Sequence, residues 1–281
     1  QLTLFNAYHG DYCYMPIHIY EGKSGKLITT VLRPGKRPTG KQIVSIVKRV
    51  VKKIRHAWPE VGILVRGDSY YSCPAVFDFC EDNDMKYVLG FKPLSPLVRQ
   101  VKPLVEEASL RFDLDRQPVK IFTETLYRAK SWRQDRRVIA KVEYNALGSN
   151  TRFIITNLEH WNRRFLYQTV YCGRGAMELM IKEHKNHLLS DRTSCPSFSA
   201  NQCRLFLHSA AYVILHTLRA LHLKGTEWAT AQFDTIRCKI IKIGARVIQR
   251  TRKIRIHLPT SFPWKGELQK IWLSCCGAGH T

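Results

Sequence analysis

A short apolar run that ends in an acid constrains the fold of this 281-residue chain more than any other feature. Val61–Val65 is apolar without clear alternation, as in a strand covered on both faces, and Asp68 follows at its carboxyl end. Pro74–Asp82 then has the pattern of a helix. This order of strand, acid and crossover helix is typical of α/β domains, so we expect a central strand with Asp68 in a site. A turn or cap role for Asp68 is the alternative.

A second candidate site lies on a helix predicted over Tyr171–Lys185. At about 100° per residue, four of its polar residues fall within a stripe roughly 60° wide. These residues are Tyr171, Arg174, Glu178 and Lys185. Apolar residues occupy the other side of the helix. One acid between two cations suits metal-dependent phosphate chemistry, since the acid holds the ion and the cations meet the phosphodiester. An ordinary solvated helix face is the alternative.

The charge of the chain indicates a polyanionic partner. Its formal net charge is +23, from 45 Lys and Arg against 22 Asp and Glu, which is more than solubility requires. Nucleic acid is the first candidate. A membrane ranks below it, because the cations are spread along the chain rather than gathered beside an apolar anchor. The nine cysteines form no C-x-x-C pair, which favours reduced thiols over a disulfide framework or a zinc ribbon.

Other patterns in the N-terminal part predict a hairpin and a helix. Tyr12–Tyr20 and Lys26–Leu32 read as paired strands, with Leu2–Phe5 as a further strand of the same sheet. Thr39 can cap a helix that ends at Trp58. The basic side of this helix is either a solvated surface or a DNA contact.

The remaining segments predict an insertion, a second core strand and a basic C-terminal region. The predicted elements are an antiparallel β insertion of short runs over Lys86–Asn150, a central strand at Phe153–Asn157, a mostly buried helix over Asn201–His222, an amphipathic helix over Asp234–Gln249, a strand with a basic face at Lys253–Leu258, and a disordered tail from Ser274. The apolar run Leu205–Leu223 contains four ionisable residues, which makes it a core helix rather than a membrane span.

This order of elements, with the signature Y-x2-R-x3-E-x6-K, resembles the DDE transposases of bacterial insertion sequences. The motifs R-G-D-S-x-(F/Y), L-T-L-F-N-A-Y-x-G-x-Y-C-Y-x-P and F-D-T-I-R-x-K-x-x-K-I-G-A-R-V resemble the first DDE group, which has an insertion before the catalytic Glu. The resemblance implies an α/β fold with a ribonuclease H-like core, a mixed sheet flanked by helices, and a β-rich insertion. The implied domains are core residues 1–88, the insertion 89–150, core residues 151–222, and a basic C-terminal extension 223–281.

The resemblance also implies the site. Three carboxylates of such a core hold two Mg²⁺ ions, with Mn²⁺ as a substitute, about 3.5–4 Å apart for phosphoryl transfer. Asp68 would be the second acid and Glu178 the third, both as metal ligands. The residues expected to contact DNA are Arg174 and Lys185 at phosphates, Tyr171 at the same backbone, and Tyr70 and Tyr71 by stacking on an unpaired or flipped base. Core packing is the alternative for at least one of Tyr70 and Tyr71.

One departure from the family concerns the first acid. The family has it on a strand shortly before L-T-L-F-N, which places it upstream of Gln1, and Asp11 is expected in a loop, where it cannot replace it. The first core strand and the region that recognises inverted repeats would then also be missing. Two acids cannot easily hold two Mg²⁺ ions. The sequence therefore predicts an N-terminally truncated transposase whose 281 residues alone neither cleave nor join DNA.

Three hypotheses for function follow. The leading one is a fragment of a transposase catalytic domain that acts on double-stranded DNA, both element ends and target, as a homodimer at the bacterial nucleoid in the cytoplasm. The alternatives are a non-catalytic DNA-binding remnant of a transposase and a ribonuclease H-like nuclease, against which the signature stripe argues. His184 and His187 lack matching ligands elsewhere, so they are expected to be solvated or to contact phosphate.

Overall fold

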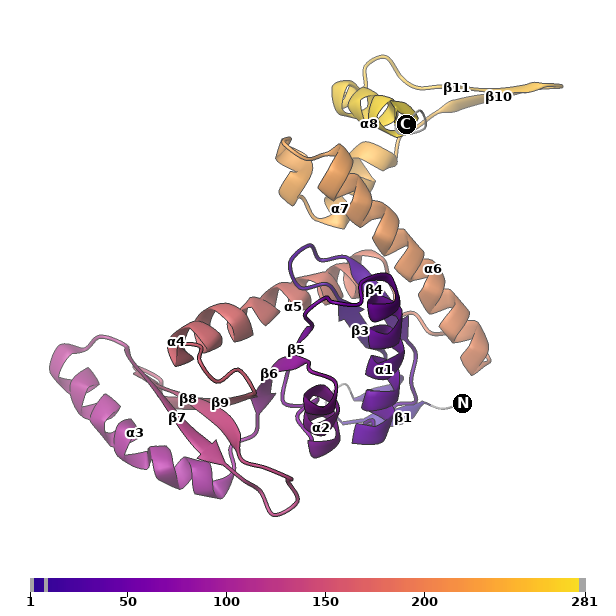
Figure 1. Cartoon of the computed structure of the whole chain (residues 1–281). Coiled ribbons are helices and arrows are strands. Elements are labelled where there is room, and N and C mark those ends of the chain that lie inside the picture. The colour runs from indigo at the N-terminus through magenta and orange to yellow at the C-terminus, as the bar shows by residue number, and fades with distance from the viewer. Residues whose placement is uncertain (1–2, 8–9, 278–281) are drawn as a thin grey trace. The chain divides into compact units, whose positions relative to one another are not determined.

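The computed structural model describes residues 3–7 and 10–277 (Figure 1). These residues form two compact units. Residues 37–175 make up one of them, called the sheet unit below. Residues 1–36 and 176–281 make up the other, called the helical unit. Each unit is described by itself.

A five-stranded mixed sheet forms the centre of the sheet unit. Its strands are, in spatial order, β5 (Leu64–Gly67), β6 (Lys86–Phe91), β9 (Gly148–Thr156), β8 (Arg136–Asn145) and β7 (Val119–Tyr127). β5 and β6 are parallel, and all other neighbours are antiparallel. The mixed α/β fold is thus confirmed. β7 and β8 belong to the same sheet as β5 and β6, so the sheet does not mark off an insertion from a core. The insertion and the domain boundaries stay predictions.

The prediction of a central strand before Asp68 was wrong. β5 lies at one edge of the sheet and pairs with β6 alone among the described strands. Val61 is 40% exposed and Leu64 is 44% exposed, so this apolar run is not covered on both faces. The central position of β9 is confirmed, and its residues Phe153–Ile155 are buried.

Three helices of the sheet unit pack with its sheet. They are α1 (Gly40–Ala57), α2 (Pro74–Asp82) and α3 (Ser95–Asp115). α1 begins with the predicted cap, in which the Thr39 hydroxyl accepts from the Gln42 N–H and the Gln42 side chain accepts from the Thr39 N–H. α3 was missed, because two prolines made its sequence look like short runs. Pro96 lies in the first turn, where its missing N–H costs no helical hydrogen bond, whereas Pro103 lies inside the helix.

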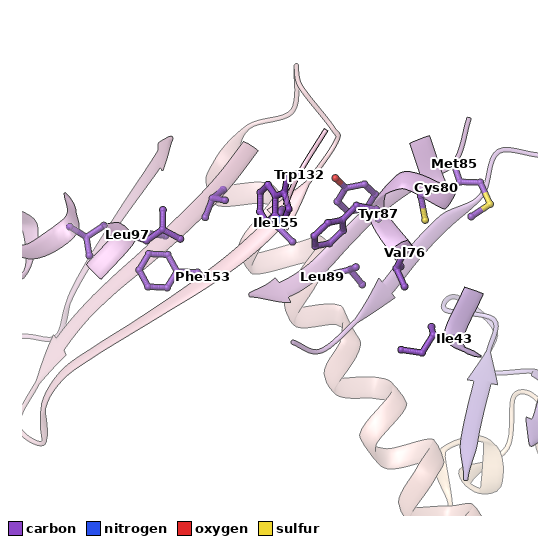
Figure 2. Close-up of a cluster of buried hydrophobic side chains, with 14 of the residues drawn as sticks. Ile43, Val76, Cys80, Met85, Tyr87, Leu89, Leu97, Trp132, Phe153 and Ile155 are labelled. Atoms are coloured by element: carbon purple, nitrogen blue, oxygen red, sulfur yellow. The ribbon is translucent and has the colours of Figure 1, made fainter. Parts of the chain in front are cut away.

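The core of the sheet unit has two parts, one on each face of the sheet. Tyr87 and Leu89 of β6 face the larger part, to which helices α1, α2 and α3 also contribute buried side chains (Figure 2). Val88 lies between them in sequence and therefore points to the other face. There it packs against Leu166 and Tyr167, so the helical turn that leads to Tyr171 covers that face.

Two separate hairpins open the helical unit. They pair β1 (Leu4–Asn6) with β2 (Asp11–Cys13) and β3 (Ile17–Tyr20) with β4 (Leu27–Val31). Asp11 was expected in a loop, which was wrong, because it is the first residue of β2. The β3–β4 hairpin confirms the prediction. The prediction of a single strand over Tyr12–Tyr20 was wrong. The strand is interrupted around Pro16, because proline has no N–H to donate to a neighbouring strand. The strand predicted at Leu2–Phe5 is present as β1, and Leu2 lies outside the described residues. Its predicted place in the same sheet as the β3–β4 hairpin was wrong, because β1 pairs with β2 in a separate sheet.

Helix α6 (Phe198–Thr217) contributes one face to the core of the helical unit. Tyr212 and Leu215 pack there with Trp228 and Phe233. The prediction of a mostly buried helix was wrong for the other face, since Phe206, Leu207 and Ile214 are 54%, 68% and 66% exposed. Among the helices that the structure describes, none combines the length and the hydrophobicity that a membrane span requires.

The C-terminal part differs most from prediction. The helix expected over Asp234–Gln249 ends at Ile241, after α7 (Phe233–Ile236) and one π-helical turn. Beyond it, β10 (Arg246–Arg250) pairs with β11 (Lys253–His257), the second of which was predicted. β-branched residues in β10 favour a strand, which the helical spacing concealed. The predicted disordered tail is helical through Gly277 in α8 (Lys265–Gly277), and residues 278–281 lie outside the described residues.

Candidate active site

Asp68 is held where the chain leaves β5. Its carboxylate Oδ1 accepts the N–H of Tyr70 at 2.9 Å, and its carbonyl oxygen accepts the N–H of Tyr71 at 3.2 Å. The Ser72 hydroxyl donates to the carbonyl oxygen of Gly90 at 2.5 Å, which ties this loop to β6. The half-buried carboxylate is therefore positioned by backbone contacts at the carboxyl end of a parallel strand pair.

Gly90 brings Tyr171 to the same place. A Cβ atom at Gly90 would lie 2.6 Å from the Tyr171 hydroxyl, 2.9 Å from the Ser69 nitrogen and 3.2 Å from the Asp68 carbonyl carbon. Such distances leave no room for a side chain. Because Gly90 has no side chain, the Tyr171 phenol and the backbone of Asp68 can both approach β6 at this residue. Two residues predicted from separate motifs therefore lie close to the same residue.

Arg66 links β5 to the helical segment that carries Tyr171. Its Nη1 donates to the carbonyl oxygen of Val170 at 3.1 Å. A Cβ atom at Gly173 would lie 2.8 Å from the same nitrogen, so a side chain there would require the end of the Arg66 side chain to shift. The Arg174 guanidinium lies 5.6 Å from the centre of the Tyr171 ring, a cation–π contact that places both predicted side chains together.

The two neighbouring tyrosines differ in their surroundings. Tyr71 packs against the larger core, and a Cβ atom at Gly67 would lie 3.0 Å from its ring. Tyr70 lies under the guanidinium of Arg37, 4.6 Å from the ring centre, and Arg37 also donates to the Tyr70 carbonyl oxygen at 3.1 Å. Core packing thus accounts for Tyr71, while the ring of Tyr70 is held by a cation.

The sequence predicted that the signature segment forms one regular α-helix, and this was wrong. A π-helical turn at Leu166–Tyr171 is followed by a 3₁₀ turn at Cys172–Arg174, by α5 (Gly175–Lys182) and by a second π-helical turn at Glu183–His187. The rotation per residue therefore changes along the segment, so the uniform 100° per residue from which the stripe was derived does not apply throughout it. Tyr171 and Arg174 belong to the sheet unit, and Glu178 and Lys185 belong to the helical unit.

Within the helical unit, Glu178 is exposed in the first turn of α5. Met180, two residues further, packs on the opposite side, and a Cβ atom at Gly25 would lie 3.0 Å from its methyl carbon. Gly25 has φ +73°, which favours glycine, so the β3–β4 turn can accept Met180 closely. This contact fixes which side of α5 presents Glu178.

Buried polar contacts hold the end of the segment. Glu183 receives two hydrogen bonds from Arg219, at 2.5 and 3.0 Å. His184 is fully buried beside His18 and Tyr20, so the expectation that it is solvated or contacts phosphate was wrong. Burial lowers the pKa of His184 to about 3, with His18 and His208 as further causes. Lys185 follows directly and is exposed.

A family model for the transposase DDE domain group 1 matches residues 1–275. The chain belongs to this family of DDE transposases. The resemblance seen in the sequence is thus confirmed, and family membership implies an enzyme that binds DNA and transfers phosphoryl groups on it. A search of curated proteins found no match to the chain.

The two acids predicted to bind a divalent metal lie in different units of the transposase. Within each unit, the described residues hold no group of three or more His, Cys, Asp or Glu side chains that could bind a metal ion. Asp68 lies in the sheet unit and Glu178 in the helical unit. Their carboxylate oxygens are the ligand type that Mg²⁺ prefers, so the donor chemistry fits.

Several supporting residues of the transposase were not predicted. Arg66 stood out only as a cation inside an apolar strand, and Gly90 only as a glycine inside a predicted strand. A glycine in a strand interior can mark a close backbone approach, which would have been the signal for Gly90. Nothing in the sequence distinguished Glu183 from the other acids of the segment.

Proposed function

We propose that the chain is the catalytic domain of an insertion-sequence transposase. Its full-length protein would cleave element ends and join them to target DNA with divalent metal ions. The observation that supports this most is the meeting of Asp68 and Tyr171 at Gly90, at the carboxyl end of a parallel strand pair. These two residues come from different motifs of the family, so their meeting agrees with one shared site.

In this proposal Asp68 and Glu178 hold the metal, which is Mg²⁺ with Mn²⁺ as a substitute. When bound, such ions activate the attacking oxygen and stabilise the leaving one. Tyr171 donates a hydrogen bond to the DNA backbone, and Arg174 and Lys185 contact phosphates near the cleaved end.

Two further parts of the proposal concern the partner and the assembly. Tyr70, held under Arg37, offers a ring face for an unpaired base, whereas Tyr71 supports it from the core. A homodimer on double-stranded DNA, at the bacterial nucleoid, would bring two element ends together.

A strand-transfer assay with the full-length protein tests the function. It uses Mg²⁺, target DNA and linear DNA carrying the ends of the element that encodes the protein. We expect 3′-hydroxyl ends to be joined, and Asp68→Asn or Glu178→Gln to reduce joining by roughly 10³-fold, since a lost ligand removes several kcal/mol of stabilisation. The matched control is Asp113→Asn, an exposed acid on α3, which should join as wild type does.

One observation favours a second candidate, a non-catalytic DNA-binding remnant. The net charge of +23 would let such a remnant bind DNA without any catalytic acid. The same assay separates the candidates. Binding without cleavage by the full-length protein would establish the remnant, and cleavage without joining would establish a ribonuclease H-like nuclease.

A further inference from the structure

The C-terminal part contains a long stretch without acids. No Asp or Glu lies between Asp234 and Glu267, whereas nine Lys and Arg do. At the centre of this stretch is the hairpin of β10 and β11, drawn in yellow in Figure 1. A run of this charge has no partner of opposite sign within itself, so its ligand is expected to be anionic.

The two faces of the hairpin differ in chemistry. Residues directly opposite each other share a face, and i and i+2 do as well. One face carries the pairs Arg246–His257, Ile248–Arg255 and Arg250–Lys253, and the other carries Val247–Ile256 and Gln249–Ile254. Four Lys or Arg residues and a histidine therefore lie on one face, called the cationic face below.

The hairpin contributes little to the folded core. Every residue of β11 and all but Ile248 of β10 are exposed. β10 and β11 form a sheet of two strands, without a third among the strands that the structure describes. A two-stranded hairpin is marginally stable in water, and the like charges of Arg250 and Lys253 directly opposite each other weaken it further. Binding of a polyanion would remove this repulsion.

The dimensions of the hairpin fit duplex DNA. Five residues per strand at about 3.4 Å each give a length of about 17 Å. A two-stranded ribbon can enter the major groove, which is about 12 Å wide and about 8.5 Å deep. We propose that the β10–β11 hairpin is a DNA-binding ribbon that enters the major groove and turns its cationic face to the phosphates. This inference rests on the proposed function and assigns a DNA contact outside the signature segment.

The test compares two triple variants of the chain with equal charge. Arg246→Gln, Arg250→Gln and Arg255→Gln neutralise the cationic face. The control, Lys102→Gln, Arg111→Gln and Arg116→Gln, removes three cations that are paired with acids on α3. Each variant lowers the net charge by three, from +23 to +20. Circular dichroism checks that both remain folded.

The readout is the affinity for duplex DNA between 50 and 200 mM salt. We expect the slope of log K against log salt to fall by about 0.9 for each lost phosphate contact, about 2.7 in all, for the hairpin variant only. Methylation of guanine N7, which lies in the major groove, should weaken binding of the wild type, and a minor-groove ligand should not displace it.

Two outcomes would overturn the inference. One is equal slopes for the two triple variants, and the other is displacement of the chain from duplex DNA by the minor-groove ligand. A wild-type chain that does not bind duplex DNA would contradict the proposed function as well, whereas binding with equal slopes contradicts the hairpin inference alone.

Discussion

Replacing Arg219 with methionine is expected to lower the free energy of unfolding of the helical unit by roughly 3 kcal/mol. Arg219 donates two hydrogen bonds to the buried Glu183 and one to the Ala231 carbonyl oxygen, and its guanidinium lies 4.4 Å from the centre of the Phe233 ring. Methionine keeps apolar contact with the ring but leaves the carboxylate buried without its cation, which costs more than the pair itself contributes.

Chemical denaturation followed by circular dichroism measures this loss. The matched control is Arg237→Met, because Arg237 also pairs with an acid, Asp234, but at the surface, with 45% and 51% of the two side chains exposed. The control should lose no more than about 1 kcal/mol. Equal losses in the two variants would show that the Glu183 pair does not hold the end of the signature segment.

Acidification is expected to destabilise the helical unit through two buried histidines. Burial lowers the pKa of His18 from 6.5 to about 4 and that of His184 from 6.5 to about 3. The unfolded chain therefore takes up these protons at a higher pH than the folded chain does. Their contribution to stability is complete above pH 6.5 and is lost as the pH falls from there toward 4 for His18 and 3 for His184, by about 1.4 kcal/mol per pH unit for each group.

The free energy of unfolding measured between pH 7.5 and pH 4.5 tests this prediction. The variants His18→Gln and His184→Gln should each reduce its pH slope by about 1.4 kcal/mol per pH unit in the acidic range. His257→Gln, at an exposed position of the same unit, serves as the control. A slope that is the same in the wild type and in both buried variants would contradict the prediction.

Much of the fold of the sheet unit could be predicted from local patterns. The cap at Thr39, the proline that starts α2 and the buried run of β9 are signals within a few residues, and each element was confirmed. The edge position of β5 and the continuous sheet from β5 to β7 could not be predicted. They depend on pairing between distant strands, which no local pattern encodes.

The site was predicted only in part, because some of its contacts also join residues that are distant in the sequence. The signature identified Tyr171 and Arg174, and the structure places them together beside the Asp68 loop. Gly90 and Arg66, which allow that approach, were missed because their roles exist only in the folded unit. The helix predicted over Asp234–Gln249 failed differently, since its apolar spacing suited a helix while residues 246–250 pair with β11.

The central claim, that Asp68 and Glu178 hold a divalent metal for chemistry on DNA, is tested most directly by Mn²⁺ binding. Electron paramagnetic resonance would follow a Mn²⁺ titration of the full-length protein with duplex DNA present, for the wild type, Asp68→Asn, Glu178→Gln and the control Asp113→Asn. We predict that each of the first two substitutions weakens Mn²⁺ binding by at least about tenfold, as loss of a ligand should, and that the control binds as the wild type does. Binding of Mn²⁺ by both acid variants as tightly as by the wild type would contradict the account.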